Sequence, residues 1–522
     1  MTERKNLPIG IQTFRHIRED NHYYVDKTGL ALSLINHGKH YFLSRPRRFG
    51  KSLFLDTLKE LFEGNEALFE GLEAQGHWDW SIKYPVIRFS FGRKNYNQLQ
   101  SLAESLNQQL TRLEQTFEVK RQFDDAGSRF ADLMDNITAK VGLPVIILID
   151  EYDKPILDAI SHPDIARKNR GFLRGFYATI KDYDAQIKFS FLTGVSKFSK
   201  VSLFSGLNNL KDITLDPRYS TLCGYTDHDI DTVFAAELIG LDREQVREWY
   251  NGYNWLGEGV YNPFDALQLF DQREFKNYWF ETGTPTFLID LIRTQRVPTP
   301  DLASRNSDEA LLSSFDLENM PVEAVMFQTG YLTIKDSTDL GGNRFYRLGY
   351  PNKEVYQSLN NSLLQYFVQN TETQVTQRMR LYSLLVDNDF DELKKLFQSF
   401  YASIPHHWYS SNDIQNYEGF YASVFYSYFA ALGLNVTVED CTNLGRIDMT
   451  LEFNNQVYIF EFKVVELVPE GNALQQIKDK GYAEKYRSLN QPIHLVGVEF
   501  SKESRNVVGF EVEQDTLLKQ HL

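Results

Sequence analysis

The chain has 522 residues, which is more than one hydrophobic core accommodates, so several domains are expected. Hydrophobic residues make up 42% and charged residues 24%, as in globular proteins, and two distant cysteines exclude a disulfide framework or a cysteine-rich zinc site. The net charge of -15 argues against a broad basic face that coats nucleic acid, so any such contact must be local.

The beginning of the sequence lacks the apolar run of a signal peptide, and no stretch approaches the roughly 18 apolar residues of a membrane span. With only two cysteines, the sequence predicts a cytoplasmic protein without a membrane partner. It leaves open whether copies of the chain form a homo-oligomer.

Residues 41–62 read YFLSRPRRFGKSLFLDTLKELF, a short apolar strand followed by an arginine-rich turn and a helix. The turn ends in Gly50, Lys51 and Ser52, the second half of the P-loop pattern G-x-x-x-x-G-K-[ST], and Leu53 follows on the helix. In this pattern the backbone N–H groups at the helix start hold phosphate oxygens, the lysine neutralises their charge, and the serine holds Mg²⁺.

The loop departs from the P-loop pattern at its start. Arg45 stands where the first glycine is expected, and Pro46 has no N–H group to donate. We expect the side chains of Arg45, Arg47 and Arg48 to compensate by donating to phosphate. The sequence therefore predicts an altered nucleotide site and not an absent one.

Further apolar strands are predicted, separated by helical patterns, in the segments 85–91, 143–153, 187–197 and 212–215. This alternation predicts a parallel sheet covered on both faces, with ligands at the carboxyl ends of its strands. Asp150, Glu151 and Thr193 fall at those ends and are expected beside Lys51. In that position Asp150 would share Mg²⁺ with Ser52, and Glu151 would polarise the attacking water.

The segments described so far resemble the AAA-ATPase-like domain that is common in bacterial proteins of unassigned role. The resemblance is carried by the motifs YVDKT (24–28), RPRRFGKS (45–52), LIDEYDKP (148–155), TGVSKFSKVSLFSGLNNL (193–210), YNGY (250–253), YNPF (261–264) and TGTPTFL (282–288). It implies a P-loop NTPase that binds ATP, with Thr193 as a sensor of the γ-phosphate and Lys197 as a second candidate. The alternative for these two residues is a capped loop after a buried strand.

The rest of the chain divides by pattern. We expect an ATPase-like domain over 1–224, a mostly helical lid on the nucleotide face over 225–302, a winged-helix-like module over 303–360, and a helical connector over 361–410. The module should hold two short helices and a hairpin with its turn at 337–343. Such modules bind DNA or only pack between domains, and the absence of Lys and Arg from 321–330 favours packing.

Residues 445–464 read GRIDMTLEFNNQVYIFEFKV, which predicts a β-hairpin with two asparagines, 454 and 455, at its turn. Pairing about that turn sets Asp448 opposite Glu461. Strand alternation then places both carboxylates and Lys463 on one face, and it buries the other face, which carries Met449, Leu451, Phe453, Phe460 and Phe462. Opposed carboxylates repel each other, so a divalent cation is expected between them.

An aspartate followed by Glu-x-Lys on the next strand makes residues 411–522 resemble the PD-(D/E)XK nucleases. The resemblance implies that Asp448 and Glu461 hold Mg²⁺ and that Lys463 orients or activates water for phosphodiester attack. It extends to the neighbouring helices, at Glu418, Gln476, Lys480 and Tyr482. The alternative is an inactive relic that keeps the fold.

These patterns together predict an α/β multidomain protein that combines a P-loop NTPase with a PD-(D/E)XK nuclease. We expect it to bind ATP and Mg²⁺ and to cleave DNA or RNA under nucleotide control, in a role such as defence against foreign nucleic acid. Two alternatives stay open at this point. One is a regulatory switch with a degenerate nuclease domain, and the other is a nuclease that needs no ATP and uses its P-loop domain only for orientation.

Overall fold

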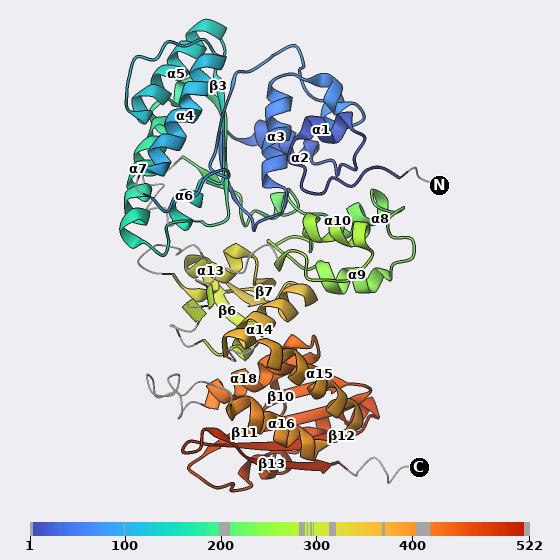
Figure 1. Cartoon of the computed structure of the whole chain (residues 1–522). Coiled ribbons are helices and arrows are strands. Elements are labelled where there is room, and N and C mark those ends of the chain that lie inside the picture. Colours follow the sequence, from blue (N-terminus) through green and yellow to red (C-terminus); the bar gives the residue numbers. More distant parts are fainter. Residues whose placement is uncertain are drawn as a thin grey trace. The chain divides into compact units, whose positions relative to one another are not determined.

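The computed structural model of the chain is shown in Figure 1. It describes residues 4–98, 100–197, 209–280, 288–289, 291–292, 295, 297–312, 320–367, 371–402 and 418–515. The chain divides into two compact units, and neither is continuous in sequence. The first unit comprises Met1–Thr282 and Asn306–Asn352, and the second comprises Gly283–Arg305 and Lys353–Leu522.

A five-stranded parallel sheet with the order β2-β3-β4-β1-β5 forms the centre of the first unit. Its strands are β1 (His40–Ser44), β2 (Val86–Ser90), β3 (Val145–Asp150), β4 (Ile187–Gly194) and β5 (Lys211–Asp212). Every residue of β1 and β3 is buried, because helices cover both faces of the sheet. The predicted parallel sheet is confirmed.

The covering helices differ between the two faces (Figure 1). One face packs on α4 (Ser101–Thr116), α5 (Ala126–Val141) and α7 (Pro163–Asp182), and the other carries α1 (Phe14–Glu19), α2 (Thr28–His37) and α3 (Lys51–Phe62). Aromatic contacts fix both layers, such as Phe89 on Phe130 and Phe54 on Phe191. The helix α3 begins at Lys51, so the Gly-Lys-Ser motif lies where β1 turns into a helix.

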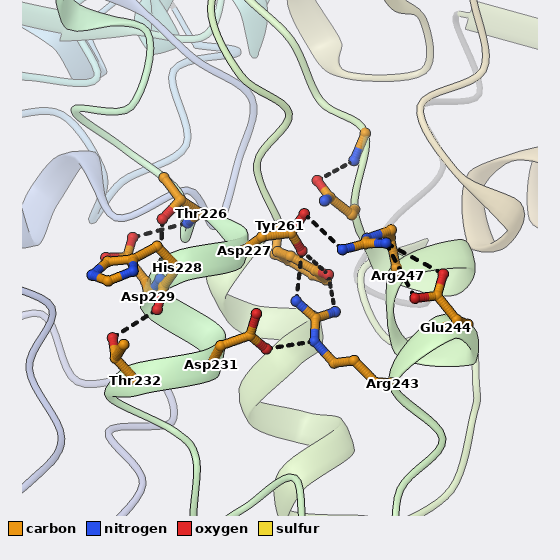
Figure 2. Close-up of polar contacts among 12 residues, drawn as sticks. Thr226, Asp227, His228, Asp229, Asp231, Thr232, Arg243, Glu244, Arg247 and Tyr261 are labelled. Carbon is orange, nitrogen blue, oxygen red and sulfur yellow. Dashed lines mark hydrogen bonds and ion pairs between the residues drawn. The ribbon is translucent and has the colours of Figure 1, made fainter.

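The segment after the sheet, which was expected to be mostly helical, contains α8 (Asp227–Thr232), α9 (Arg243–Tyr250) and α10 (Pro263–Gln272), joined by long stretches of turns and irregular chain. Figure 2 shows the polar contacts that hold this segment together. The guanidinium of Arg243 contacts both Asp227 and the hydroxyl of Tyr261 at 2.6 Å, and the Tyr261 hydroxyl donates to Asp227 at 2.7 Å. This network joins α8 to α9 and to the chain that enters α10.

The module after the lid holds β6 (Arg305–Asp308), α12 (Glu309–Leu312), α13 (Val322–Thr329), β7 (Thr333–Leu340) and β8 (Asn343–Gly349). Its strands form a three-stranded sheet with the order β6-β8-β7. The two helices and the hairpin follow the prediction, but the expected turn at 337–343 was too long. Only Gly341 and Gly342 form the turn, with φ of 60° and 84°, because glycine enters the left-handed region without strain.

The second unit has a five-stranded sheet with the order β13-β12-β11-β10-β9, in which only β11 and β12 run parallel. The strands are β9 (Asn435–Cys441), β10 (Arg446–Phe453), β11 (Gln456–Val465), β12 (Ile493–Ser501) and β13 (Asn506–Gln514). One face packs on α18 (Glu418–Ala431) and α16 (Phe390–Ala402), and the other on α19 (Asn472–Asp479) and the 3₁₀ helix η9 (Tyr482–Leu489).

The unit boundaries differ from the expected domain boundaries in two places. Residues 283–305 belong to the second unit, although the lid was expected to end at 302. The expected connector is helical, with α14 (Lys353–Phe367), α15 (Thr371–Asp387) and α16, but α15 and α16 contribute leucines and aromatics to the core of the second sheet. None of the helices in the described part of the chain is long and apolar enough to cross a membrane.

Candidate functional site

The loop between β1 and α3 forms one wall of a cavity of about 450 Å³ in the first unit. The residues that this loop contributes to the cavity include Arg47, Arg48, Gly50, Lys51, Ser52 and Leu53. The opposite walls come from the segment 8–12 and from Tyr225, Pro263, Phe264 and Leu267 of the helical segment. Residues of the helical segment therefore line this cavity together with the segment 8–12, which the sequence did not single out.

Arg45 lies under the loop and not in the cavity, so the expectation that it donates to phosphate is wrong. Its side chain is fully buried and stacks on Trp255, with 4.1 Å between the guanidinium carbon and the ring centroid. The guanidinium donates to three backbone carbonyls, those of Ser44, Thr214 and Tyr219. Burial lowers the pKa of Arg45 to about 10. The side chain thus ties the end of β1 to the chain after β5.

Aromatic residues support the loop where glycine is missing. Phe49 is buried and packs edge-on against Tyr253 and Trp255, with ring centroids 4.8 and 5.4 Å away. Arg48 takes a left-handed φ of 70° and places its guanidinium 4.8 Å from the ring centroid of Phe264. The WYNGYNW stretch at 249–255 therefore holds the loop in its turn.

Lys51 is fixed by its own loop. Its ammonium donates to the carbonyls of Arg45 at 2.9 Å and Pro46 at 2.8 Å, and the side chain is buried. Burial lowers the pKa of the Lys51 ammonium. A cation that lines a cavity and that, among the described residues, has carbonyl dipoles as its hydrogen-bond partners is well suited to receive an anionic ligand.

The acids at the ends of the strands lie close by. Thr193 at the end of β4 donates its hydroxyl to Asp150 at 3.0 Å, and both side chains are buried. Glu151 lines the cavity with a left-handed φ of 54°, and burial followed by the charge of Asp150 raises its pKa. Lys197 instead pairs with Asp212 at 2.6 Å, and it is not among the cavity-lining residues in the described part of the chain.

Asp153 is a cavity residue that the sequence did not single out. Its buried carboxylate accepts the backbone N–H groups of Val195 at 3.0 Å and Ser196 at 2.6 Å, and burial raises its pKa to about 6. It therefore ties the loop after β3 to the segment after β4. The third acid of LIDEYD was the available signal, because it stands at the same strand end as Asp150 and Glu151.

The hairpin of the second unit has the predicted register, with Met449 opposite Phe460 and Leu451 opposite Tyr458. The turn consists of two asparagines, 454 and 455, with φ of 51° and 56°. Four apolar residues of one face are buried in the core with α18, namely Met449, Leu451, Phe460 and Phe462, while Phe453 packs at its edge. The opposite face of the hairpin packs on α19 and η9.

Asp448, Glu461 and Lys463 lie together on the face toward α19. Asp448 accepts the backbone N–H of Phe462 at 2.8 Å, and Glu461 accepts the ammonium of Lys463 at 3.2 Å. Glu461 is only 1% exposed, and burial followed by the charge of Asp448 raises its pKa to about 7. Burial also raises the pKa of Asp448. Two carboxylates are thus held together where water screens them poorly.

Two family models match this chain. The model described as a predicted AAA-ATPase matches residues 8–204, and that of the PD-(D/E)XK nuclease superfamily matches residues 416–510. The chain belongs to the AAA-ATPase-like proteins that carry a C-terminal PD-(D/E)XK nuclease domain. It is 59% identical over 511 residues to an uncharacterized protein in the vnfD 5′ region of Azotobacter chroococcum mcd 1, which covers 98% of this chain and 99% of the relative. No solved structure matches.

The helices around the nuclease hairpin bring some of the predicted residues to the carboxylates. Gln476 on α19 donates its side-chain amide to Glu461. Tyr482 donates its hydroxyl to the carbonyl of Arg446 at 2.8 Å, and burial followed by the charge of Glu461 raises its pKa. Lys480 is exposed at the C-terminal end of α19, and no contact of the described residues joins it to the carboxylates. Glu418 opens α18, but its side chain lies outside the described part of the chain.

The nuclease carboxylates fit a divalent cation in their chemistry. One oxygen of Glu461, Oε2, is buried and has no hydrogen-bond partner among the residues that the structure describes. A buried carboxylate oxygen without a donor is costly unless a cation pairs with it. Within the same described residues, no group of three or more His, Cys, Asp or Glu side chains gathers as a metal site. Asp448 and Glu461 would therefore supply two of the ligands.

Proposed function

We propose that this protein is an ATP-controlled, Mg²⁺-dependent nuclease that cleaves phosphodiester bonds of DNA or RNA. The observation that supports it most directly is the buried pair of Asp448 and Glu461 beside Lys463, with an unpartnered oxygen on Glu461. A structural ion pair would use that oxygen, and a solvated surface hairpin would leave these carboxylates exposed. The arrangement is costly for the fold and useful for holding a cation.

Each residue of the nuclease face has a distinct part in this proposal. Asp448 and Glu461 would hold Mg²⁺, which when bound polarises a phosphate and lowers the pKa of its water. The N–H of Phe462 keeps the Asp448 carboxylate oriented, and the amide of Gln476 holds Oε1 of Glu461. Lys463 would orient and polarise the attacking water through its ammonium, which also pairs with Glu461.

For the nucleotide site, we assign the roles from the residues that line the cavity and from their neighbours. The backbone at the start of α3 would hold the phosphates of ATP, with Lys51, Arg47 and Arg48 facing them from the cavity wall. Ser52 and Asp150 would hold the accompanying Mg²⁺, with Thr193 fixing the orientation of Asp150. Glu151 would activate the water for hydrolysis. The apolar wall from the lid offers a surface for the base.

A cleavage assay with purified full-length protein tests the proposal. Labelled single- and double-stranded DNA and RNA are incubated with Mg²⁺, with and without ATP. We expect cleavage of one substrate class that ATP changes, and its loss in Asp448→Ala and in Lys463→Ala, of which only Asp448→Ala also loses Mg²⁺ binding. Wild-type protein that cleaves none of the four substrates under any condition would contradict the nuclease assignment.

The ATPase half is tested in parallel by phosphate release. Glu151→Gln should bind ATP as tightly as the wild type and release no phosphate, because the amide cannot accept a proton from water. A wild type that binds ATP but never hydrolyses it would favour the regulatory switch, in which binding alone controls the nuclease domain. The altered loop start, with Pro46 lacking an N–H group, is the observation that favours this second function.

A further inference from the structure

The module formed by residues 306–352 packs within the first unit but is joined at both ends to the second. Residues Gly283–Arg305 precede it and Lys353–Leu522 follow it, and both belong to the nuclease-bearing unit. The module is therefore inserted into the second unit along the chain, although its packing partners lie in the first.

The module packs closely against the loop between β1 and α3. Gly330 follows α13 with a φ of 92°, and a methyl group on its Cα would lie 2.8 Å from Cβ and Cγ of Pro46. The carbonyl of Pro46 is one of the two that hold the ammonium of Lys51. A ligand that draws Lys51 away removes a partner of the Pro46 peptide, and the close contact passes any shift on to Gly330.

The module also holds the segment that follows β4. Gln328 on α13 is 5% exposed, accepts the backbone N–H of Lys197 at 2.9 Å, and donates to the carbonyl of Leu312 at 2.8 Å. The neighbouring N–H groups in that segment, of Val195 and Ser196, are held by Asp153 in the cavity wall. Gln328 is therefore hydrogen-bonded to the segment 195–197, so a shift of that segment would displace the Gln328 side chain.

The chain segments that flank the module on either side both contact α18, or the chain just after it, in the nuclease domain. Before the module, Thr299 bonds with its backbone N–H and its hydroxyl to Ser423 on α18, each at 3.2 Å. After it, Tyr356 on α14 donates to the carbonyl of Leu434, just beyond α18, at 3.3 Å. On its other side α18 packs Phe425 against Phe460 and Phe462, which flank Glu461.

We propose that residues 306–352 transmit the state of the nucleotide site to the nuclease domain through α18, with Gln328 and Gly330 as positioning residues. This inference rests on the proposed function, since it names how ATP regulates the nuclease. The transmitting contacts are few and tightly packed, so small rearrangements at the loop become displacements of a whole element.

The test compares glycine variants of the full-length protein. Gly330→Ala should weaken ATP binding about tenfold, or 1.4 kcal/mol, because the added methyl displaces Pro46. Gly342→Ala is the matched control, because Gly342 also has a positive φ, of 84°, but has nothing within 4 Å of an added methyl. It should bind ATP like the wild type. Equal losses in the two variants would show that backbone strain, and not the contact with Pro46, is responsible and would overturn the inference.

Hydrogen exchange in α18 tests transmission without relying on activity. Saturating ATP should change amide exchange in α18 about threefold in the wild type and in Gly342→Ala, and it should leave exchange unchanged in Gln328→Leu. The inference is overturned if wild-type protein binds ATP without any change in α18, or if folded Gln328→Leu responds like the wild type. If the wild type does not bind ATP at all, the proposed function fails as well, so the two failures are distinguishable.

Discussion

At the scale of single residues, the buried charged side chains in and beneath the candidate nucleotide site have backbone groups as hydrogen-bond partners. Lys51 has two backbone carbonyls, Arg45 has three, and Asp153 has two backbone N–H groups. None of these three pairs with an opposite charge among those hydrogen bonds. Dipoles compensate a buried charge without cancelling it, so the cavity keeps its field for a charged ligand.

Replacing Lys51 by alanine should abolish ATP binding and leave the fold intact. We expect the ammonium, the point charge at the start of α3, to face the phosphates, so its loss should remove at least two charge-assisted hydrogen bonds and lower the affinity by more than about 100-fold. Isothermal calorimetry on folded protein measures it. Lys59→Ala, on the same helix but paired with Glu63 at the surface, is the control and should bind normally. Unchanged affinity in Lys51→Ala would contradict the P-loop assignment.

Asp153 should make stability depend on pH in the acid range. Burial raises its pKa to about 6 in the folded protein, above the ordinary value of 3.8, so the folded state binds the proton more tightly than the unfolded state does. The stabilising contribution is complete below about pH 4 and is lost as the pH rises through 6. Urea unfolding at pH 4.5 and 7 should show a loss, on the order of 2 kcal/mol, that Asp153→Asn lacks. Parallel pH curves for both proteins would refute this.

The burial of Arg45 could not be predicted from the sequence. Its carbonyl partners Thr214 and Tyr219 lie 169 and 174 residues further along the chain, and the stacking ring belongs to Trp255. The pattern G-x-x-x-x-G-K-[ST] could show that Arg45 was unusual, but only the tertiary fold decides on which side of the loop its side chain lies. Lys51 was predictable because its position follows from the local turn into α3.

At the scale of elements, the nuclease hairpin was predictable in register and in the direction of each face. A two-residue turn fixes the pairing, and strand alternation fixes the faces, so no distant contact was needed. The insertion of the module between two segments of the second unit was not predictable. It depends on which elements pack together, and the composition of residues 283–305 carries no sign of it.

The hairpin turn gives a test of this element. Asn455→Gly should fold as stably as the wild type or gain up to about 0.5 kcal/mol, because glycine takes the observed φ of 56° freely. Asn455→Val should cost about 1 to 2 kcal/mol, since a branched side chain is strained there. Glu452→Val, three residues earlier at an exposed position near the end of β10, is the control and should change stability little. Denaturant midpoints compare all three, and an equal cost of valine at 452 and 455 would contradict the turn geometry.

At the scale of the whole molecule, the two sites belong to different units and should take up their ligands separately. Mg²⁺ alone should stabilise the nuclease domain, and ATP the ATPase-like domain, each by about 2.7 kcal/mol at 100 times its Kd. In thermal unfolding, Asp448→Ala should lose the shift caused by Mg²⁺ alone and keep the shift caused by ATP. Lys51→Ala should show the reverse. A loss of both shifts in either variant would mean that the two sites are one.

The close fit between Gly330 and Pro46 has a consequence for how such proteins diverge. Because the module 306–352 is flanked on both sides by the nuclease-bearing unit, one genetic crossover near residue 282 moves module and nuclease together. The transferred Gly330 must then fit the loop of a different ATPase-like domain, and in this chain that fit leaves only 2.8 Å between Pro46 and an added methyl. We therefore expect a recombinant to function only where the loop and the end of α13 fit each other as Pro46 and Gly330 do here.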